Sequence, residues 1–308
     1  MFLCCGEALI DMVPLKDENG QQGFTPIAGG AIFNTAISMG RLERQVGLLS
    51  SISSDLFGQQ LVDNLHASQV DASYLVRPSL PTTLAFVQLI DSHASYTFYD
   101  ENSAGRSLTE SDLPAIPESV NGLYFGGISL ISEPAADAYA SLAEAQATDK
   151  LIVLDPNIRT SFITDETSYR SRLQRIIAVA DLVKVSDEDL AWLQPQAATE
   201  AEAVAALRGH DAQHVIVTRG AEGTEIYLAD GSLVECDAVK AQVVDTVGAG
   251  DTFNAGVLAS LDQQGLLSKQ ALGNATQDQW YVALGLGAQV AAVTVSRAGA
   301  NPPWLTEL

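Results

Sequence analysis

The feature that most constrains the fold is a regular alternation of strand and helix signals that begins at residue 122. Short runs rich in Val, Ile and Leu are each followed by a longer stretch that mixes polar and apolar positions. The predicted strands are residues 122–131, 151–159, 182–186 and 214–223, and the predicted helices are residues 134–148, 168–180 and 187–194. Because strand–helix–strand units connect parallel neighbours, this rhythm predicts an α/β fold with a mainly parallel, helix-covered sheet.

Strand signals in the N-terminal third do not follow this rhythm. Residues 1–13 read as one strand, buried at first and then alternating, while residues 82–102 contain two strand-like runs around residues 92–94 that are typical of a hairpin. These segments predict a small β appendage on the α/β body. We therefore expect a single domain over residues 1–308, with a small β lid formed by roughly residues 12–30 and 82–102.

Composition argues against several classes of function. The chain has 38 Asp and Glu residues against 16 Lys and Arg, a formal net charge of −22 at pH 7, whereas nucleic-acid binding relies on Lys and Arg. Cys4, Cys5 and Cys236 predict neither a disulfide framework nor a zinc site. The N-terminus lacks a basic region, and the apolar tract 280–295 falls short of a bilayer span. We expect a soluble cytoplasmic protein without nucleic-acid or membrane partners.

The stretch VVDTVGAGDTFNAGVLASL, Val243–Leu261, carries the strongest chemical signal. Its glycines allow a tight turn whose backbone N–H groups converge, and the helix that starts near Asp251 points its dipole at the same place. This arrangement suits phosphoryl transfer: the N–H groups hold the migrating group while Asp251 accepts a proton from the attacking hydroxyl. For G-A-G-D alone, a helix start with Asp251 as N-cap is the alternative interpretation. The Walker pattern G-x-x-x-x-G-K-[ST] is absent, and the dinucleotide-binding pattern lacks its third glycine here.

Several segments together resemble one enzyme family. The glycine stretch resembles the C-terminal signature of the ribokinase-like, or PfkB-type, carbohydrate kinases. GEALIDMVP and AGGAIFNTAISMGRL resemble the family's first strand and N-terminal signature, except at Ile32, where the pattern has Pro, Ala or Gly. LDPNIR, VKVSDEDL, VTRGAEG and VSRAGANPP resemble further family segments in the expected order. An ordered set that covers nearly the whole chain is far more specific than any one motif.

The resemblance implies a ribokinase-like three-layer α/β sandwich with a mainly parallel central sheet and a small β-sheet lid. It implies that ATP donates its γ-phosphate to a sugar hydroxyl, with Mg²⁺ as helper and a K⁺-like ion behind the glycine turn. Asp251 would be the catalytic base, and the N–H groups of Gly248, Ala249 and Gly250 would form the anion hole.

The remaining candidate residues fall into three groups. Those expected near the sugar are Asp11, Gly29, Gly30, Asn34, Phe98, Arg106, Asn157 and Arg159. Those expected beside the nucleotide, together with the glycine turn, are Lys184, Ser186, Thr218, Gly220 and Gly223. Those expected to hold cations are Asp189, through water to Mg²⁺, and Asp245 and Thr246, mostly through backbone oxygens to K⁺. The family usually has Asn and Glu where Ser186 and Asp189 stand.

Taken singly, many of these residues have plain structural interpretations. Asp11 and Asp155 could form turns, Asn34 could be a polar surface residue, and Arg159 could be solvated. The acidic run that contains Asp189 could simply start a helix. The functional interpretation therefore depends on the set.

Two segments bear on the substrate. LDPNIR and YTFYDENSAGRSL most resemble the fructokinase branch of the family. This resemblance favours D-fructose as the sugar and fructose 6-phosphate as the product. A 2-keto-3-deoxygluconate kinase is an alternative, because a carboxylated substrate would suit Arg106 or Arg159. A catalytically silent sugar-binding relative is a further alternative. Lid sheets of this family often pair between subunits, so the resemblance also implies a homodimer through the β lid.

Overall fold

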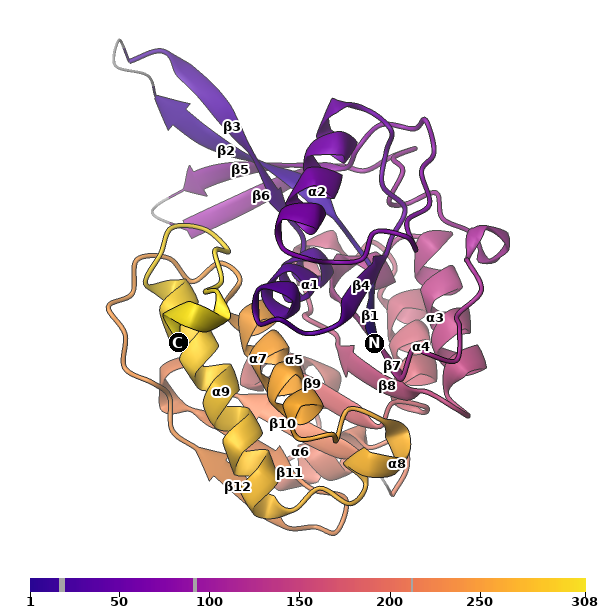
Figure 1. Cartoon of the computed structure of the whole chain (residues 1–308), viewed down its shortest axis with the longest axis vertical. Helices are drawn as coiled ribbons and strands as arrows, with labels where there is room; N and C mark the ends of the chain where they lie inside the picture. The colour runs from indigo at the N-terminus through magenta and orange to yellow at the C-terminus, as the bar shows by residue number, and fades with distance from the viewer. Residues whose placement is uncertain (17–19, 91–92, 212) are drawn as a thin grey trace.

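The structure is a computed structural model that describes residues 1–16, 20–90, 93–211 and 213–308 (Figure 1). It contains a large β-sheet in the body of the molecule and a small one that projects from it. The predicted α/β class with a small β appendage is confirmed. Within the described ranges, no helix combines the length and the apolar character needed to cross a bilayer.

The large sheet has eight strands in the order β12-β11-β10-β9-β8-β7-β1-β4. Their bounds are β1 Phe2–Cys5, β4 Val46–Leu49, β7 Gly122–Gly126, β8 Leu151–Asp155, β9 Leu182–Ser186, β10 His214–Thr218, β11 Thr224–Tyr227 and β12 Leu233–Cys236. Neighbours from β10 to β4 run parallel, whereas β11 and β12 form an antiparallel hairpin at one edge. The alternation of strands and helices therefore produces the expected sheet, with an antiparallel hairpin added at its end.

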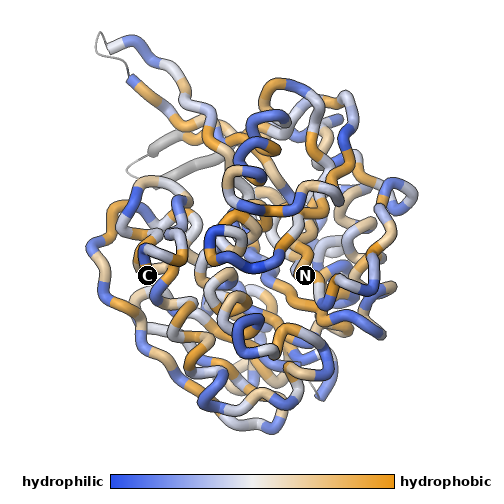
Figure 2. Tube along the Cα trace, viewed as in Figure 1, coloured by the Kyte–Doolittle hydropathy of each residue, from blue (hydrophilic) through white to orange (hydrophobic). Residues whose placement is uncertain are grey.

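Helices cover both faces of this sheet. Along β1, Phe2 and Cys4 belong to one buried cluster and Leu3 and Cys5 to another, because successive side chains of a strand point to opposite faces. The helices over the first cluster are α1 Ala31–Arg41, α2 Leu56–Ala67, α7 Ala249–Gln263, α8 Lys269–Leu272 and α9 Gln277–Val295. Those over the second are α3 Ala135–Gln146, α4 Glu166–Ile177, α5 Asp187–Leu193 and α6 Glu200–Leu207. Along many of these helices hydrophobic and hydrophilic colours alternate (Figure 2), as in helices with one buried face.

The small sheet consists of β2 (Leu9–Lys16), β3 (Gln22–Gly29), β5 (Leu84–Ile90) and β6 (His93–Tyr99) in the order β3-β2-β5-β6. Strands β2 and β5 are parallel, and each pairs with an antiparallel partner at the edge. The pairing of β5 with β6 confirms the predicted hairpin, although part of its turn, residues 91–92, lies outside the described residues.

The single strand predicted over residues 1–13 is wrong, because the chain forms β1 in the large sheet and β2 in the small one. The chain leaves the large sheet at Gly6, where a Cβ would lie 2.5 Å from Cγ1 of Ile32 and 2.7 Å from Oγ of Ser129. Both strands begin with buried apolar residues. Hydropathy alone therefore gives no sign that the chain changes sheets.

Candidate active site

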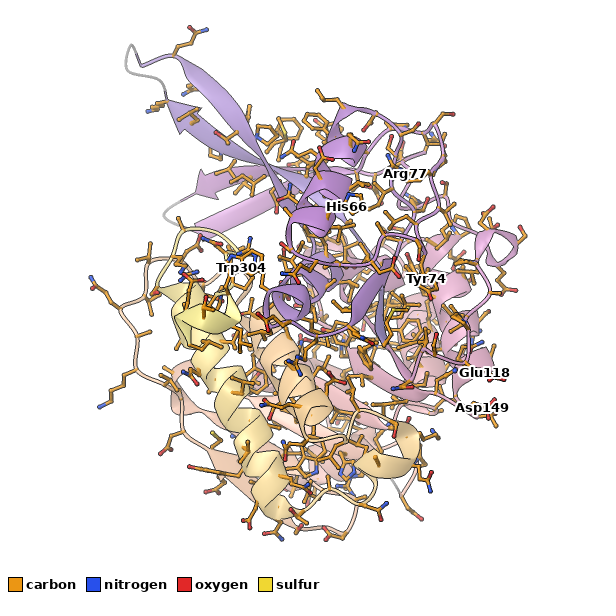
Figure 3. The ribbon with its side chains drawn as sticks, in the orientation of Figure 1. His66, Tyr74, Arg77, Glu118, Asp149 and Trp304 are labelled. Carbon is orange, nitrogen blue, oxygen red and sulfur yellow. The ribbon has the colours of Figure 1, made fainter. Side chains whose placement is uncertain are left out.

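The predicted site residues gather at the carboxyl edge of the large sheet. Asn157 follows β8, Ser186 ends β9 and Thr218 ends β10, while the small sheet begins just after β1. In open parallel sheets, ligands bind outside the carboxyl ends of the strands. By contrast, His66 and Arg77, labelled in Figure 3, line a surface pocket beside α2 that contains none of the predicted residues.

The glycine turn leads directly into α7. Gly248 is the N-cap with a left-handed φ of 79°, and a Cβ there would lie 2.5 Å from the Cβ of Ala300, so glycine suits both the conformation and the space. Ala249 differs from the expected anion hole, because its N–H donates to the carbonyl of Thr246 at 3.2 Å. Within the described residues, the N–H groups of Gly248 and Gly250 donate to no acceptor. These two groups are the ones left for an anion.

Asp251 is the centre of a cluster of hydrogen-bonded polar side chains. It lies in the first turn of α7 and is only 7% exposed. Asn34 on α1 donates from Nδ2 to Oδ2 of Asp251 at 2.9 Å, and Nδ2 of Asn157 lies 3.5 Å from Oδ1. The hydroxyl of Thr35 donates to the backbone carbonyl of Asp251 at 3.1 Å. Asn34 is therefore a buried partner of the carboxylate rather than a polar surface residue.

The surroundings of Asp251 make its carboxyl group a weak acid. Burial raises its pKa to about 7, and the negative charges of Asp155 and Glu7 act in the same direction. The hydrogen bond from Asn34 and the positive charge of Arg159 lower the pKa. A carboxylate with a pKa near the working pH is suited to general-base catalysis.

A second buried carboxylate, Asp155, holds the neighbouring elements together. It is 1% exposed, and its Oδ2 accepts from Nζ of Lys184 at 3.0 Å and from Nδ2 of Asn254 on α7 at 2.6 Å. Its Oδ1 accepts the N–H of Asn157 at 3.0 Å. A Cβ on Gly250 would lie 3.4 Å from Nζ of Lys184, so the ammonium group borders the glycine turn. The interpretation of Asp155 as a simple turn former missed this role.

The small sheet places Asp11 and Phe98 on one face. Ile27, Asp11, Ala85 and Phe98 pair successively across the four strands, and directly paired residues point to the same side of a sheet. Burial raises the pKa of Asp11 to about 6. At neutral pH this group is a partly buried carboxylate flanked by apolar side chains.

The two glycines predicted near the sugar lie where the small sheet joins α1. Gly29 ends β3, and a Cβ there would collide with the carboxylate of Asp11. Gly30 is the N-cap of α1 with a φ of 111°. Both positions therefore need glycine for space or for backbone conformation.

The two arginines predicted near the sugar have different surroundings. Arg159 is exposed, and its charge acts on both Asp251 and Asp189. Arg106 lies in the segment that follows β6. Its guanidinium group forms an ion pair with Asp100 at 3.6 Å and donates to the carbonyl of Glu133 at 3.2 Å. Its contacts therefore do not join it to the Asp251 cluster.

Phe98 touches the body of the molecule through Phe162, with ring centroids 4.4 Å apart in an edge-on arrangement. Phe162 lies in a short 3₁₀ helix, Thr160–Phe162, directly after Arg159. The face of the small sheet that carries Asp11 and Phe98 therefore turns toward the segment that contains Asn157 and Arg159. This contact brings the predicted lid and the carboxyl edge together.

The residues expected beside the nucleotide end strands or shape turns. Ser186 is the N-cap of α5, and its hydroxyl accepts the N–H of Asp189 at 3.0 Å. Thr218 ends β10, and its hydroxyl donates to the carbonyl of Val185 at 3.4 Å. Gly220 and Gly223 have positive φ values of 53° and 104°. They give the turn after β10 a backbone that other residues rarely adopt.

The residues expected to hold cations are fixed in place by the backbone. Asp189 is 8% exposed, its Oδ1 accepts the N–H of Ile158 at 3.2 Å, and burial raises its pKa. Asp245 accepts the N–H groups of Val247 at 3.0 Å and Gly299 at 2.9 Å. It therefore ties the loop before the glycine turn to the C-terminal loop. Among the described residues, no three His, Cys, Asp or Glu side chains converge as a metal-binding group.

Comparison with known proteins decides the family. The family model described as pfkB family carbohydrate kinase matches residues 1–307. The chain belongs to the PfkB family of carbohydrate kinases. Among curated relatives, it is 46% identical over 274 residues to a fructokinase of Rhizobium leguminosarum bv. trifolii, covering 89% of this chain and 83% of the relative.

Solved PfkB-type structures share the fold. A fructokinase with bound ATP from Xylella fastidiosa is similar with a TM-score of 0.88 at 29% identity, covering 99% of this chain and 96% of the other. A fructokinase from Vibrio cholerae O395, in a form with fructose, ADP and calcium ion, gives a TM-score of 0.82 at 26% identity, covering 97% and 94%. The expected ribokinase-like fold and sugar-kinase class are thereby confirmed.

In this PfkB family member, sequence reasoning missed part of the buried cluster. Glu7, Thr35, Asp155 and Asn254 all contact the candidate residues, directly or through α1. A local signal existed for Asn254, because it follows Asp251 by three residues on the same helix and so shares its face. Asp155 ends β8 and Glu7 lies in the connection after β1, and a carboxylate in either place has several ordinary explanations.

Proposed function

We propose that this carbohydrate kinase transfers the γ-phosphoryl group of ATP to the 6-hydroxyl of D-fructose. The observation that carries the proposal is Asp251, a buried carboxylate with a pKa of about 7 in the first turn of α7, beside the glycine turn. The similarity to fructokinases supports the choice of sugar.

The proposed step is a direct displacement. The 6-hydroxyl loses its proton to the carboxylate of Asp251, and its oxygen forms a bond to the γ-phosphorus. The bond from that phosphorus to the β–γ bridging oxygen breaks, and ADP leaves. In this proposal, negative charge on the transferring group is stabilised by the N–H groups of Gly248 and Gly250 and by the ammonium of Lys184, which lies beside the glycine turn.

We assign sugar binding to the face of the small sheet that carries Asp11 and Phe98. A carboxylate accepts hydrogen bonds from sugar hydroxyls, while a ring covers an apolar patch of the sugar. Asn157 and Arg159 approach from the body of the molecule. The small sheet then acts as a lid that excludes water, which prevents ATP from being hydrolysed.

We assign nucleotide binding to the loops after β9 and β10, with Ser186, Thr218, Gly220 and Gly223 beside the phosphates or the nucleoside. The donor chemistry fits Mg²⁺, which binds through one or two carboxylates and several waters. Asp189 would hold Mg²⁺ through water, and the bound ion would neutralise charge on the phosphates. Backbone oxygens around Asp245 and Thr246 suit a K⁺-like ion.

We also propose a homodimer through the small sheet. Phe24 and Tyr99 lie on the face of this sheet opposite Asp11 and Phe98, and they are 47% and 63% exposed. Exposed apolar side chains that gather on one face mark interaction surfaces. Light scattering over a range of concentrations tests this point, and a monomer throughout contradicts it.

A sugar panel tests the function. Purified protein with ATP and Mg²⁺ should release ADP with D-fructose, and kcat/KM should be higher for fructose than for 2-keto-3-deoxygluconate. A higher value for the keto acid would favour the alternative kinase. Sugar binding by calorimetry without ADP release would indicate a silent relative.

A further inference from the structure

Glu7 is a carboxylate that the proposed reaction does not use. It lies in the three-residue connection between β1 and β2, where the chain passes from the large sheet to the small one. Its Oε1 accepts the N–H of Ala31 at 2.9 Å, and its Oε2 accepts the N–H of Ser129 at 3.2 Å. Its backbone carbonyl accepts the N–H of Phe33 at 3.2 Å.

These bonds make Glu7 the cap of α1, supplied from another part of the chain. The first N–H groups of a helix have no partner inside the helix, and the N-cap Gly30 has no side chain to offer. Glu7 satisfies two of them, those of Ala31 and Phe33. Its negative charge also lies at the positive end of the helix dipole.

The space around this carboxylate is formed by glycines. A Cβ on Gly30 would lie 3.0 Å from the carbonyl oxygen of Glu7 and 3.1 Å from its Cγ. A Cβ on Gly127 would collide with the carboxylate itself, and Gly127 has a positive φ of 66°. The backbone therefore approaches the side chain closely from two sides, which fixes its position.

The helix that Glu7 caps carries the partners of the proposed base. Asn34 and Thr35 lie one turn into α1, where they bond the side chain and the backbone of Asp251. Gly30 is also where the small sheet returns to the body of the molecule. Glu7 thus links both N-terminal connections between the sheets to the helix that orients Asp251.

We propose that Glu7 is a positioning residue for phosphoryl transfer, which fixes α1 and thereby the orientation of Asp251 relative to the sugar. This proposal rests on the proposed function. Because small displacements of a reacting group reduce the rate of the chemical step, loss of Glu7 acts on kcat more than on KM.

The test compares three variants. In Glu7→Ala, kcat should fall by about 10- to 100-fold with little change in KM, and amide hydrogen exchange should accelerate at residues 31–34. In Glu7→Gln the effect should be smaller, because the amide oxygen still accepts from Ala31 while the NH₂ group faces the Ser129 N–H. This second variant keeps the test decisive if Glu7→Ala does not fold.

Asp165→Ala is the matched control. Asp165 caps α4 by accepting the N–H of Ser168 at 3.0 Å, and α4 carries none of the candidate residues. This variant should lower the urea concentration at the midpoint of unfolding, while kcat stays unchanged. An unchanged kcat in the Glu7 variants, or a rise in KM alone, overturns the positioning role. If the wild-type protein phosphorylates no sugar, the proposed function fails, and hydrogen exchange still decides whether Glu7 holds α1.

Discussion

Two buried carboxylates lie at the same edge of the large sheet, in surroundings of opposite character. Asp155 is paired with the ammonium of Lys184 and also accepts hydrogen bonds from the Asn157 N–H and the Asn254 amide. Within the part of the chain that the structure describes, the carboxylate of Asp251 has amide partners alone, from Asn34 and Asn157, and burial raises its pKa to about 7. A buried charge with a cationic partner holds structure together, whereas one without such a partner retains affinity for a proton. The same Asp-to-Asn change should therefore have opposite consequences at the two positions.

The largest expected effect is on turnover in Asp251→Asn. The amide cannot accept the proton of the sugar hydroxyl, so kcat should fall by about 10²- to 10⁴-fold in an assay of ADP release. Asp262→Asn is the control, because Asp262 is an exposed residue near the other end of α7. Retained turnover in Asp251→Asn contradicts the base role.

The same variant also tests how strongly burial acts on Asp251. Its pKa is about 7 in the folded protein, against the ordinary value of 3.8 for an aspartate exposed to water, so the folded state binds the proton more tightly. The ionised group therefore lowers stability progressively as pH rises from about 4 to about 7. Asp251→Asn removes this penalty and should be the more stable protein at pH 8, by up to about 4 kcal/mol at 1.4 kcal/mol per pKa unit. Urea unfolding at pH 4 should show a much smaller difference.

Asp155→Asn should change stability in the other direction. It leaves the ammonium of Lys184 buried without its anionic partner, which typically lowers the free energy of unfolding by about 3–5 kcal/mol. The double variant Asp155→Asn/Lys184→Met should recover much of that loss, since no charge is then left unpaired. Urea unfolding of the single and double variants measures both effects. Equal stability of Asp155→Asn and the wild-type protein would remove the proposed contrast between the two carboxylates.

A local sequence pattern predicted Asp251 but not its surroundings, and the reason is the distance along the chain. The glycine turn, the helix start and the acid are contiguous, so a local pattern contains them all. The hydrogen bond from Asn34 to Asp251 joins residues 217 positions apart, and that from Lys184 to Asp155 spans 29. Nothing local distinguishes such an Asn from a surface residue. Recognition of a family supplied Asn34 and Lys184, while Asp155 remained a turn former.

The fold was predictable where each element carries its own signal. Alternating strands and helices from residue 122 onward, and the β5–β6 hairpin, follow from periodicity alone. The change of sheet after Cys5 did not follow from periodicity, because β1 and the start of β2 are equally apolar. The break depends on Gly6, which packs against Ile32. The roles in binding sugar, nucleotide and cations stay predictions that depend on the resemblance to a family.

The smallest expected effect concerns the hydrogen bond from Asn34, which lowers the pKa of Asp251. In the wild-type protein, kcat/KM should fall below about pH 7 as the carboxyl group becomes protonated. Asn34→Ala removes a bond that lowers this pKa, so the acidic limb should move to higher pH by about one unit or less. Thr35→Val is the matched comparison: its hydroxyl bonds the backbone carbonyl of Asp251 and not the carboxylate. It should leave the position of the limb unchanged, whatever it does to kcat. A limb that moves equally in both variants would mean that α1 acts on Asp251 through its placement rather than through the Asn34 amide.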